Sequence, residues 1–211
     1  MAVICPTVTA YDTHAYREQI ERVEPFAERI HIDLMDGIFA PTQSPPLNQI
    51  WLPDTLVCDI HLMYQRPMNY LEQLVKLNPH LVVIHAEADV DHAHFATHLR
   101  ERGIKAGLAL LQKTTIDSVA ELMSCFDHVL VFSGDLGHHG GQADLTLLDK
   151  VRQLRETYPK LEISWDGGIN DQNAPQLIEA GVDVLNVGGF IQKADNPEGR
   201  YAALMELANQ G

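Results

Sequence analysis

Short apolar runs recur along this chain, and their residues do not alternate with polar ones. The runs are rich in valine, isoleucine and leucine and are about five or six residues long, which is typical of strands buried on both faces of a parallel sheet. They cover Val3–Val8, Arg29–Asp33, Leu56–His61, Leu81–His85, Ala106–Leu111, His128–Phe132, Leu161–Trp165 and Val182–Val187. We therefore expect eight parallel strands.

The segments between these runs have helical periodicity. Tyr16, Ile20 and Val23 fall on one face of an expected helix. Similar stripes are formed by Leu71, Leu74 and Val75, by Leu147, Leu148, Val151 and Leu154, and by Leu177 with Ile178. Eight strand segments and about eight helical segments, with a repeat of roughly 26 residues, predict an α/β fold, a (β/α)8 barrel formed as a single domain by residues 1–211. The first helix is not opened by Gly-x-Gly-x-x-Gly, so a dinucleotide-binding sheet has no support.

The amino-acid composition argues against some classes of binding partner and cellular location. The 211 residues carry a net charge of −14 and contain no basic run, so we expect neither nucleic acid nor a membrane as a partner. No apolar stretch reaches the roughly 18 residues of a membrane span, and the first residues lack the features of a secretion signal. Three cysteines without Cys-x-x-Cys spacing are typical of reduced thiols, so we expect a cytoplasmic protein.

Histidine and aspartate gather where the apolar runs end. His31 and Asp33 are two residues apart and therefore share one face of a strand. His61 ends the third run and Asp166 follows the seventh. In a (β/α)8 barrel the carboxyl ends of the strands form one mouth, so we expect these side chains to converge there. Two imidazoles and two carboxylates can bind one divalent metal ion (Zn²⁺, Fe²⁺, Mn²⁺ or Co²⁺), the alternative being polar groups satisfied by water.

Glycines gather in the loops after the last three runs. The pairs are Gly140-Gly141, Gly167-Gly168 and Gly188-Gly189. Phosphate groups in these barrels bind to backbone N–H groups after the seventh and eighth strands, so the pairs predict a phosphate site. Ordinary turn chemistry is the alternative.

Several motifs along nearly the whole chain resemble those of the ribulose-phosphate 3-epimerase family. They are Ile4-Cys5-Pro6-Thr7, His31-Ile32-Asp33-Leu34-Met35-Asp36-Gly37, His61-Leu62-Met63, Gly107-Leu108-Ala109-Leu110, Gly140-Gly141-Gln142 and Asp166-Gly167-Gly168-Ile169-Asn170. The resemblance implies a (β/α)8-barrel isomerase with one divalent metal ion, and an assembly that is often a dimer or hexamer. It implies that His31, Asp33, His61 and Asp166 bind the metal ion.

The resemblance also implies roles around the substrate. Asp33 and Asp166 are expected to be the catalytic acid and base. The substrate is expected to contact Thr7, which replaces a serine, and His61, Met35 and Met63, with its phosphate on Gly141, Gln142, Gly168, Gly188 and Gly189.

Four departures from the family pattern leave the substrate open. The loop Ser133–Gln142 is longer by one residue, Phe132 stands where a methionine is usual, and Ile38 and Thr42 replace a histidine and an asparagine. We expect proton transfer at C3 between D-ribulose 5-phosphate and D-xylulose 5-phosphate, through an enediolate. A 3-epimerase of a ketohexose phosphate and a non-catalytic sugar-phosphate-binding relative remain alternatives. No lysine lies near Asp33, which counts against a decarboxylase or an aldol-type synthase.

Other histidines have weaker signals. His85 ends the fourth run and is followed by Glu87, which leaves open a role in supporting the metal site or contacting substrate. His94 and His98 lie four residues apart on an expected helix, a spacing more common on solvent-facing surfaces than in metal sites. His138 and His139 lie in the lengthened loop, either as ordinary surface residues or as part of a lid.

Overall fold

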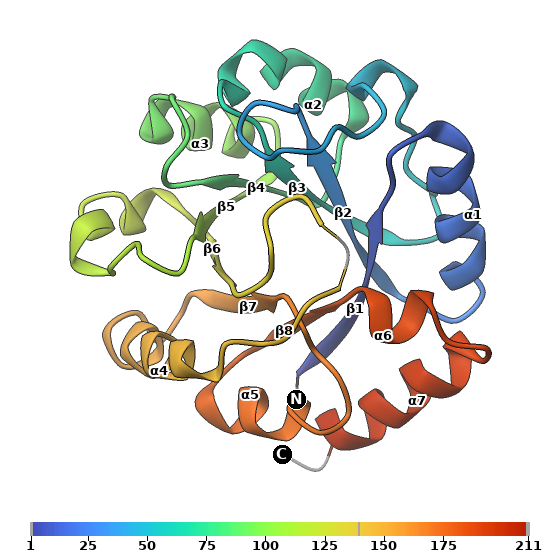
Figure 1. Ribbon diagram of the computed structural model, residues 1–211. Helices are drawn as coiled ribbons and strands as arrows, with labels where there is room; N and C mark the ends of the chain where they lie inside the picture. Colours follow the sequence, from blue (N-terminus) through green and yellow to red (C-terminus); the bar gives the residue numbers. More distant parts are fainter. Residues whose placement is uncertain (1, 139, 210–211) are drawn as a thin grey trace.

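The computed structural model describes residues 2–138 and 140–209, and its centre is a closed barrel of eight parallel strands (Figure 1). The strands are β1 (Val3–Thr9), β2 (Arg29–Met35), β3 (Val57–Met63), β4 (Leu81–His85), β5 (Lys105–Leu110), β6 (His128–Phe132), β7 (Glu162–Asp166) and β8 (Val184–Val187). Each strand pairs with the next, and β8 pairs with β1 to close the barrel. The predicted fold class is confirmed, with strand ends within two residues of those expected.

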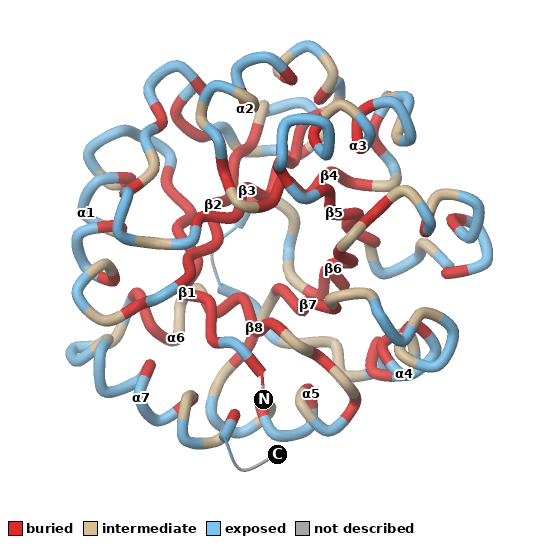
Figure 2. Tube along the Cα trace, turned by 180° about the vertical axis from the view of Figure 1, so that it is seen from behind, coloured by how far each residue is buried: buried red, intermediate tan, exposed pale blue. Residues whose placement is uncertain are grey.

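Helices surround the barrel and cover its strands. They are α1 (Thr13–Val23), α2 (Leu71–Leu77), α3 (His92–Arg100), α4 (Leu148–Thr157), α5 (Ala174–Ala180), α6 (Gly189–Gln192) and α7 (Pro197–Ala208). Figure 2 shows the buried strands at the centre and the exposed outer faces of the helices. Tyr16, Ile20 and Val23 are buried on the inner face of α1, as the pattern predicts. None of the helices in the described residues is long and apolar enough to cross a membrane.

The expectation of a helix after each strand is wrong for two segments of the described chain: the one between β2 and β3, where the only helical element is a single 3₁₀ turn, and the one between β5 and β6. Within the described residues, the segment between β5 and β6 contains only the 3₁₀ turns η3 (Asp117–Val119) and η4 (Met123–Cys125). The Ser118 hydroxyl donates a hydrogen bond to the backbone oxygen of Thr115 (2.7 Å), and such side-chain bonds compete with helical backbone bonds. The other 3₁₀ turns are η1 (Leu47–Gln49), η2 (Pro67–Tyr70) and η5 (Leu145–Leu147).

Strand register brings polar side chains together inside the barrel. Thr9 of β1 lies beside Asp33 of β2, and Asp33 lies beside His61 of β3. On the other side of β1, Asp166 of β7 lies beside Asn186 of β8. Neighbouring residues in a parallel ladder point to the same face, so these side chains all face the interior near the carboxyl ends of the strands.

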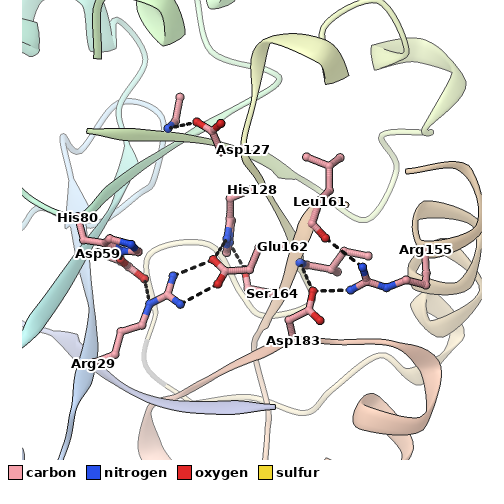
Figure 3. Close-up of polar contacts among 12 residues, drawn as sticks. Arg29, Asp59, His80, Asp127, His128, Arg155, Leu161, Glu162, Ser164 and Asp183 are labelled. Atoms are coloured by element: carbon pink, nitrogen blue, oxygen red, sulfur yellow. Dashed lines mark hydrogen bonds and ion pairs between the residues drawn. The ribbon is translucent and has the colours of Figure 1, made fainter. Parts of the chain in front are cut away.

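A second polar cluster lies at the amino ends of the strands (Figure 3). The guanidinium of Arg29 donates to Asp59 (2.7 Å) and, through two nitrogens, to Glu162 (3.0 and 2.9 Å). The ring of His128 lies between Glu162 (2.8 Å) and the Ser164 hydroxyl (2.6 Å). Burial raises the pKa of Glu162, but His128 and Arg29 outweigh it and hold that pKa well below its usual range. This cluster fills the end of the barrel opposite the mouth.

Candidate metal centre and adjoining cavity

The structure brings together the four residues that the sequence suggests as metal ligands. One ligand atom from each of His31, Asp33, His61 and Asp166 lies within 4.8 Å of all the others. His31 Nε2 is 3.4 Å from Asp33 Oδ1 and 3.7 Å from Asp166 Oδ2. His61 Nδ1 is 3.0 Å and 3.6 Å from the same two oxygens. The four side chains therefore point at one small region, although they come from three strands of the barrel.

The donor atoms of this cluster fit a divalent metal ion. His31 Nε2 is buried and has no hydrogen-bond partner among the described residues. A buried polar atom without a partner is costly, and a metal ion at the centre of the cluster would satisfy it. Two imidazole nitrogens and two carboxylate oxygens are ligands for Zn²⁺, Fe²⁺, Mn²⁺ and Co²⁺ alike. The cluster can hold a metal ion, and its donor set does not select which one.

Charges within the cluster shift the proton affinities of its members. Burial raises the pKa of Asp33, but the neighbouring imidazole rings of His31 and His61 outweigh it and hold that pKa well below its usual range. Burial lowers the pKa of His61, but Asp166 and Asp33 outweigh it and raise that pKa to about 9. Since a metal ion binds only unprotonated imidazole, binding of a metal ion by His61 would compete with protons for this ring.

Neighbouring side chains fix the orientation of two of these residues. The Thr9 hydroxyl donates to Asp33 Oδ2 (2.7 Å), which leaves Oδ1 facing the histidines. His61 Nε2 lies 2.8 Å from His85 Nε2, and His85 Nδ1 lies 3.5 Å from Glu87 Oε2. Burial lowers the pKa of His85 to about 4, so its neutral ring can accept the N–H of His61. His85 is therefore placed to support the cluster, and such contacts strengthen metal binding.

A cavity of about 300 Å³ adjoins the two carboxylates of the cluster. Of the residues expected to contact substrate or phosphate, six line this cavity: Thr7, Met63, Gly141, Gly168, Gly188 and Gly189. Met35 is buried against Met63 and Ala40. Gln142 has an exposed side chain, and it and His61 are not among the residues that line the cavity.

The loop after β6 crosses the barrel mouth (Figure 1). The Gly137 carbonyl accepts hydrogen bonds from the Thr42 hydroxyl (2.5 Å) and the Tyr11 hydroxyl (3.3 Å). Leu136 packs against the buried Met35, Ala40 and Met63 cluster. His138 lines the cavity, and His139 lies outside the described residues. The lengthened loop is thus part of the cavity wall.

The His94 and His98 pair lies outside the metal centre. His94 is exposed on α3, and His98 Nε2 lies 3.4 Å from the Glu72 carboxylate. Within the described chain, neither histidine lies in a group of three or more side chains whose donor atoms could share a metal ion.

Gly168 is required by the geometry of the cavity wall. Its φ of +70° is unfavourable for other residues, and a Cβ there would lie 2.1 Å from the backbone nitrogen of Ala143. Gly168→Ala is therefore expected to separate the loops after β6 and β7. We expect the KM for a phosphorylated substrate to rise at least about tenfold, because hydrogen bonds to the substrate would be lost. Steady-state kinetics would test this, with Gly103→Ala as a control for positive φ, because no atom lies within 4 Å of a Cβ at Gly103. Equal KM values for Gly168→Ala and Gly103→Ala would contradict the requirement for glycine at position 168.

Thr9, Asn186 and Lys193 are polar residues of the cavity lining that the sequence patterns do not assign to the site. Thr9 was detectable because it shares a strand face with Thr7, two residues before it. Asn186 was detectable as a polar residue within the apolar run Val182–Val187. Lys193 lines the cavity from the residue after α6 and had no local signal, because isolated lysines are common on surfaces.

These features define the class of protein: a (β/α)8 barrel whose mouth joins a candidate metal centre to a glycine-lined cavity. The sequence profile of the ribulose-phosphate 3 epimerase family matches residues 3–191. The chain belongs to this family, which confirms the resemblance seen in its motifs, and it is an epimerase, an enzyme of the isomerase class.

Relatives with the name ribulose-phosphate 3-epimerase match most of the chain. The protein from Mycobacterium tuberculosis (strain ATCC 25618 / H37Rv) is 30% identical over 98% of this chain and 93% of its own length. The protein from Treponema pallidum (strain Nichols) is 33% identical over 88% of each chain. The protein from Bacillus subtilis (strain 168) is 32% identical over 90% of this chain and 92% of its own.

More distant solved structures share the fold. The structure of 3-hexulose-6-phosphate synthase from Salmonella typhimurium has a TM-score of 0.73, with 14% identity over 99% of both chains. The structure of 3-keto-L-gulonate-6-phosphate decarboxylase from Vibrio cholerae O1 biovar El Tor str. N16961 has a TM-score of 0.77, with 12% identity over 99% of this chain and 98% of its own. At such identities the likeness concerns the barrel alone.

Proposed function

We propose that this epimerase interconverts D-ribulose 5-phosphate and D-xylulose 5-phosphate by proton transfer at C3. The observation that carries the proposal is the position of Asp33 and Asp166, which both line the cavity. They come from β2 and β7, three positions apart around the eight-stranded barrel. Two carboxylates that approach a substrate from different sides can serve its two faces.

The two carboxylates perform the proton transfers of this scheme. One of them, Asp33 or Asp166, removes the C3 proton from one face, and the other returns a proton to the opposite face of the planar enediolate. Their roles exchange in the reverse reaction. A divalent ion bound by the cluster, Zn²⁺, Fe²⁺, Mn²⁺ or Co²⁺, would supply positive charge that stabilises the negative charge developing on the substrate oxygens. Met63 lines the same cavity, and its polarizable side chain would flank the enediolate.

The glycine loops are proposed to hold the phosphate. Gly141, Gly168, Gly188 and Gly189 line the cavity and leave their backbone N–H groups unobstructed by side chains. Gln142 is included through its backbone, which lies against Gly168: the carbonyl carbon of Gln142 would be 2.4 Å from a Cβ on that glycine. Lys193 adds a positive charge to the same wall.

One observation favours a second candidate substrate, a ketohexose phosphate. Phe132 lines the cavity where the family usually has a methionine, and the longer loop after β6 supplies Gly137 and His138 to the same wall. These changes alter the space next to the reacting carbon while leaving both carboxylates in place.

A homo-oligomer, either a dimer or a hexamer, remains a prediction.

Proton exchange at C3 of D-ribulose 5-phosphate in deuterated water tests the proposed function. Metal-loaded protein is expected to exchange this proton and form D-xylulose 5-phosphate, and chelator-treated protein is expected to do neither. Readdition of the metal ion should restore both rates, which controls for damage by the chelator. No exchange with the metal ion demonstrably bound would contradict the proposal, and a ketohexose phosphate would then be tested, followed by simple binding of sugar phosphates.

A further inference from the structure

Asn186 of β8 is a buried amide without a partner. Its residue is 2% exposed, and neither Nδ2 nor Oδ1 has a hydrogen-bond partner among the described residues. The hydroxyl oxygen of Thr7 on β1 is also buried and has no hydrogen-bond partner among the described residues. Both residues line the cavity. Buried polar groups are normally hydrogen-bonded, so two unpaired groups in one cavity indicate a ligand that completes them.

Strand register places this amide between the two parts of the candidate site. Asn186 lies beside Asp166 on the neighbouring strand β7. Gly188 follows two residues later, directly after the end of β8, and lines the same cavity. The amide is thus bracketed by a proton-transferring carboxylate and the proposed phosphate site.

We propose that Asn186, with Thr7, binds the C4 hydroxyl of the ketose phosphate and selects for its presence. This inference rests on the proposed function, in which C3 faces the carboxylates and the phosphate on C5 faces the glycine loops. C4 is the carbon between them, so its hydroxyl falls beside the amide. A hydroxyl can accept and donate at the same time, so one substrate hydroxyl can accept a hydrogen bond from Asn186 Nδ2 and donate one to the Thr7 hydroxyl oxygen.

A purely structural role does not account for this asparagine. Its strand neighbours Val184, Leu185 and Val187 are buried and apolar, and a leucine would fill a similar volume without burying an amide. Elsewhere inside the barrel, the buried Ser164 hydroxyl is paired with His128 (2.6 Å). The Ser164 hydroxyl thus has a partner in the barrel interior, whereas the Asn186 amide has none among the described residues.

The test combines the variant Asn186→Leu with a substrate that lacks the hydroxyl. With D-ribulose 5-phosphate, Asn186→Leu is expected to lower kcat/KM by about 10- to 100-fold, mostly through KM, because a hydrogen bond of the bound substrate is lost. With the 4-deoxy analogue of D-ribulose 5-phosphate, wild type and variant are expected to have similar kcat/KM values. The melting temperature of the substrate-free variant should be unchanged or higher, since an unpaired buried amide has been removed.

Ser164→Ala is the matched control, because it removes a buried polar group that is paired and lies outside the cavity lining. It is expected to lower the melting temperature and to leave the preference for the 4-hydroxyl unchanged. If Asn186→Leu does not fold, Asn186→Ala replaces it with the same expectations for substrate preference. An equal loss of kcat/KM with both substrates would overturn the proposal.

A wild-type protein that does not exchange the C3 proton would instead refute the proposed function. In that case, calorimetric binding of D-ribulose 5-phosphate and its 4-deoxy analogue to wild type and Asn186→Leu still decides the role of the amide. Tighter binding of the 4-hydroxy compound to wild type alone would support the C4 contact. Equal affinities would reject it.

Discussion

Replacing Asp166 or Asp33 with asparagine is expected to lower kcat for epimerisation by at least about 10³-fold while the barrel still folds. An amide of nearly the same shape cannot take up or release the C3 proton, and general acid–base groups typically contribute about 10²–10⁴-fold. Each substitution also removes an anionic ligand from the candidate metal centre. Formation of D-xylulose 5-phosphate, measured beside circular dichroism and metal content, would show the effect.

Asp149→Asn provides the matched control for these two variants. Asp149 lies on the outer face of α4, where it pairs with Arg152 and has a side chain that is 90% exposed. The same chemical change there should leave kcat within about twofold, because exposed pairs contribute little. Near-normal turnover by either Asp33→Asn or Asp166→Asn, with the protein folded, would refute the two-carboxylate scheme.

Arg29→Ala is expected to reduce the free energy of unfolding by about 3–5 kcal/mol, the usual result of removing one partner from a buried ion pair. Arg29 lies between the Asp59 and Glu162 carboxylates at the amino end of the barrel (Figure 3). The side chain of Asp59 is only 2% exposed, so removing the guanidinium leaves a buried negative charge without this partner. Urea unfolding near neutral pH would measure the change.

The loss of unfolding free energy in Arg29→Ala should become smaller in acid. In the folded protein, His128 and Arg29 outweigh the effect of burial and hold the pKa of Glu162 below its usual range. This stabilisation is present above the unfolded carboxyl pKa of about 4.3 and is lost as the pH falls through the lower folded pKa. The stability difference between wild type and Arg29→Ala should therefore narrow below about pH 4.

The exposed pair between Arg152 and Asp149 serves as the control for this stability measurement. Arg152→Ala is expected to change the free energy of unfolding by no more than about 0.5 kcal/mol, as is usual for surface substitutions. A similarly small change in Arg29→Ala would mean that the cluster at the amino end does not stabilise the barrel.

Local patterns predicted the repeated strands because each strand is buried on both faces and must be apolar along its length. The same reasoning was weaker for helices. Between β5 and β6, the buried Val119 and Met123 cover the barrel from 3₁₀ turns, and the sequence periodicity does not distinguish these from a short helix. The first and last residues of strands were also less predictable, since pairing with neighbours decides where a strand ends.

The sequence by itself determined the barrel, the shared face of His31 and Asp33, and the glycine loops, because these depend on spacing within single segments. His61 and Asp166 joined the candidate centre because they stand at the ends of the third and seventh apolar runs, and the carboxyl ends of the strands meet at one mouth. Only the tertiary structure decided that His85 contacts His61 and that Asn186 is unpaired beside Asp166. The physical reason is that contacts across a barrel depend on strand register and closure, which arise from the packing of all eight strands together and not from the residues of any one.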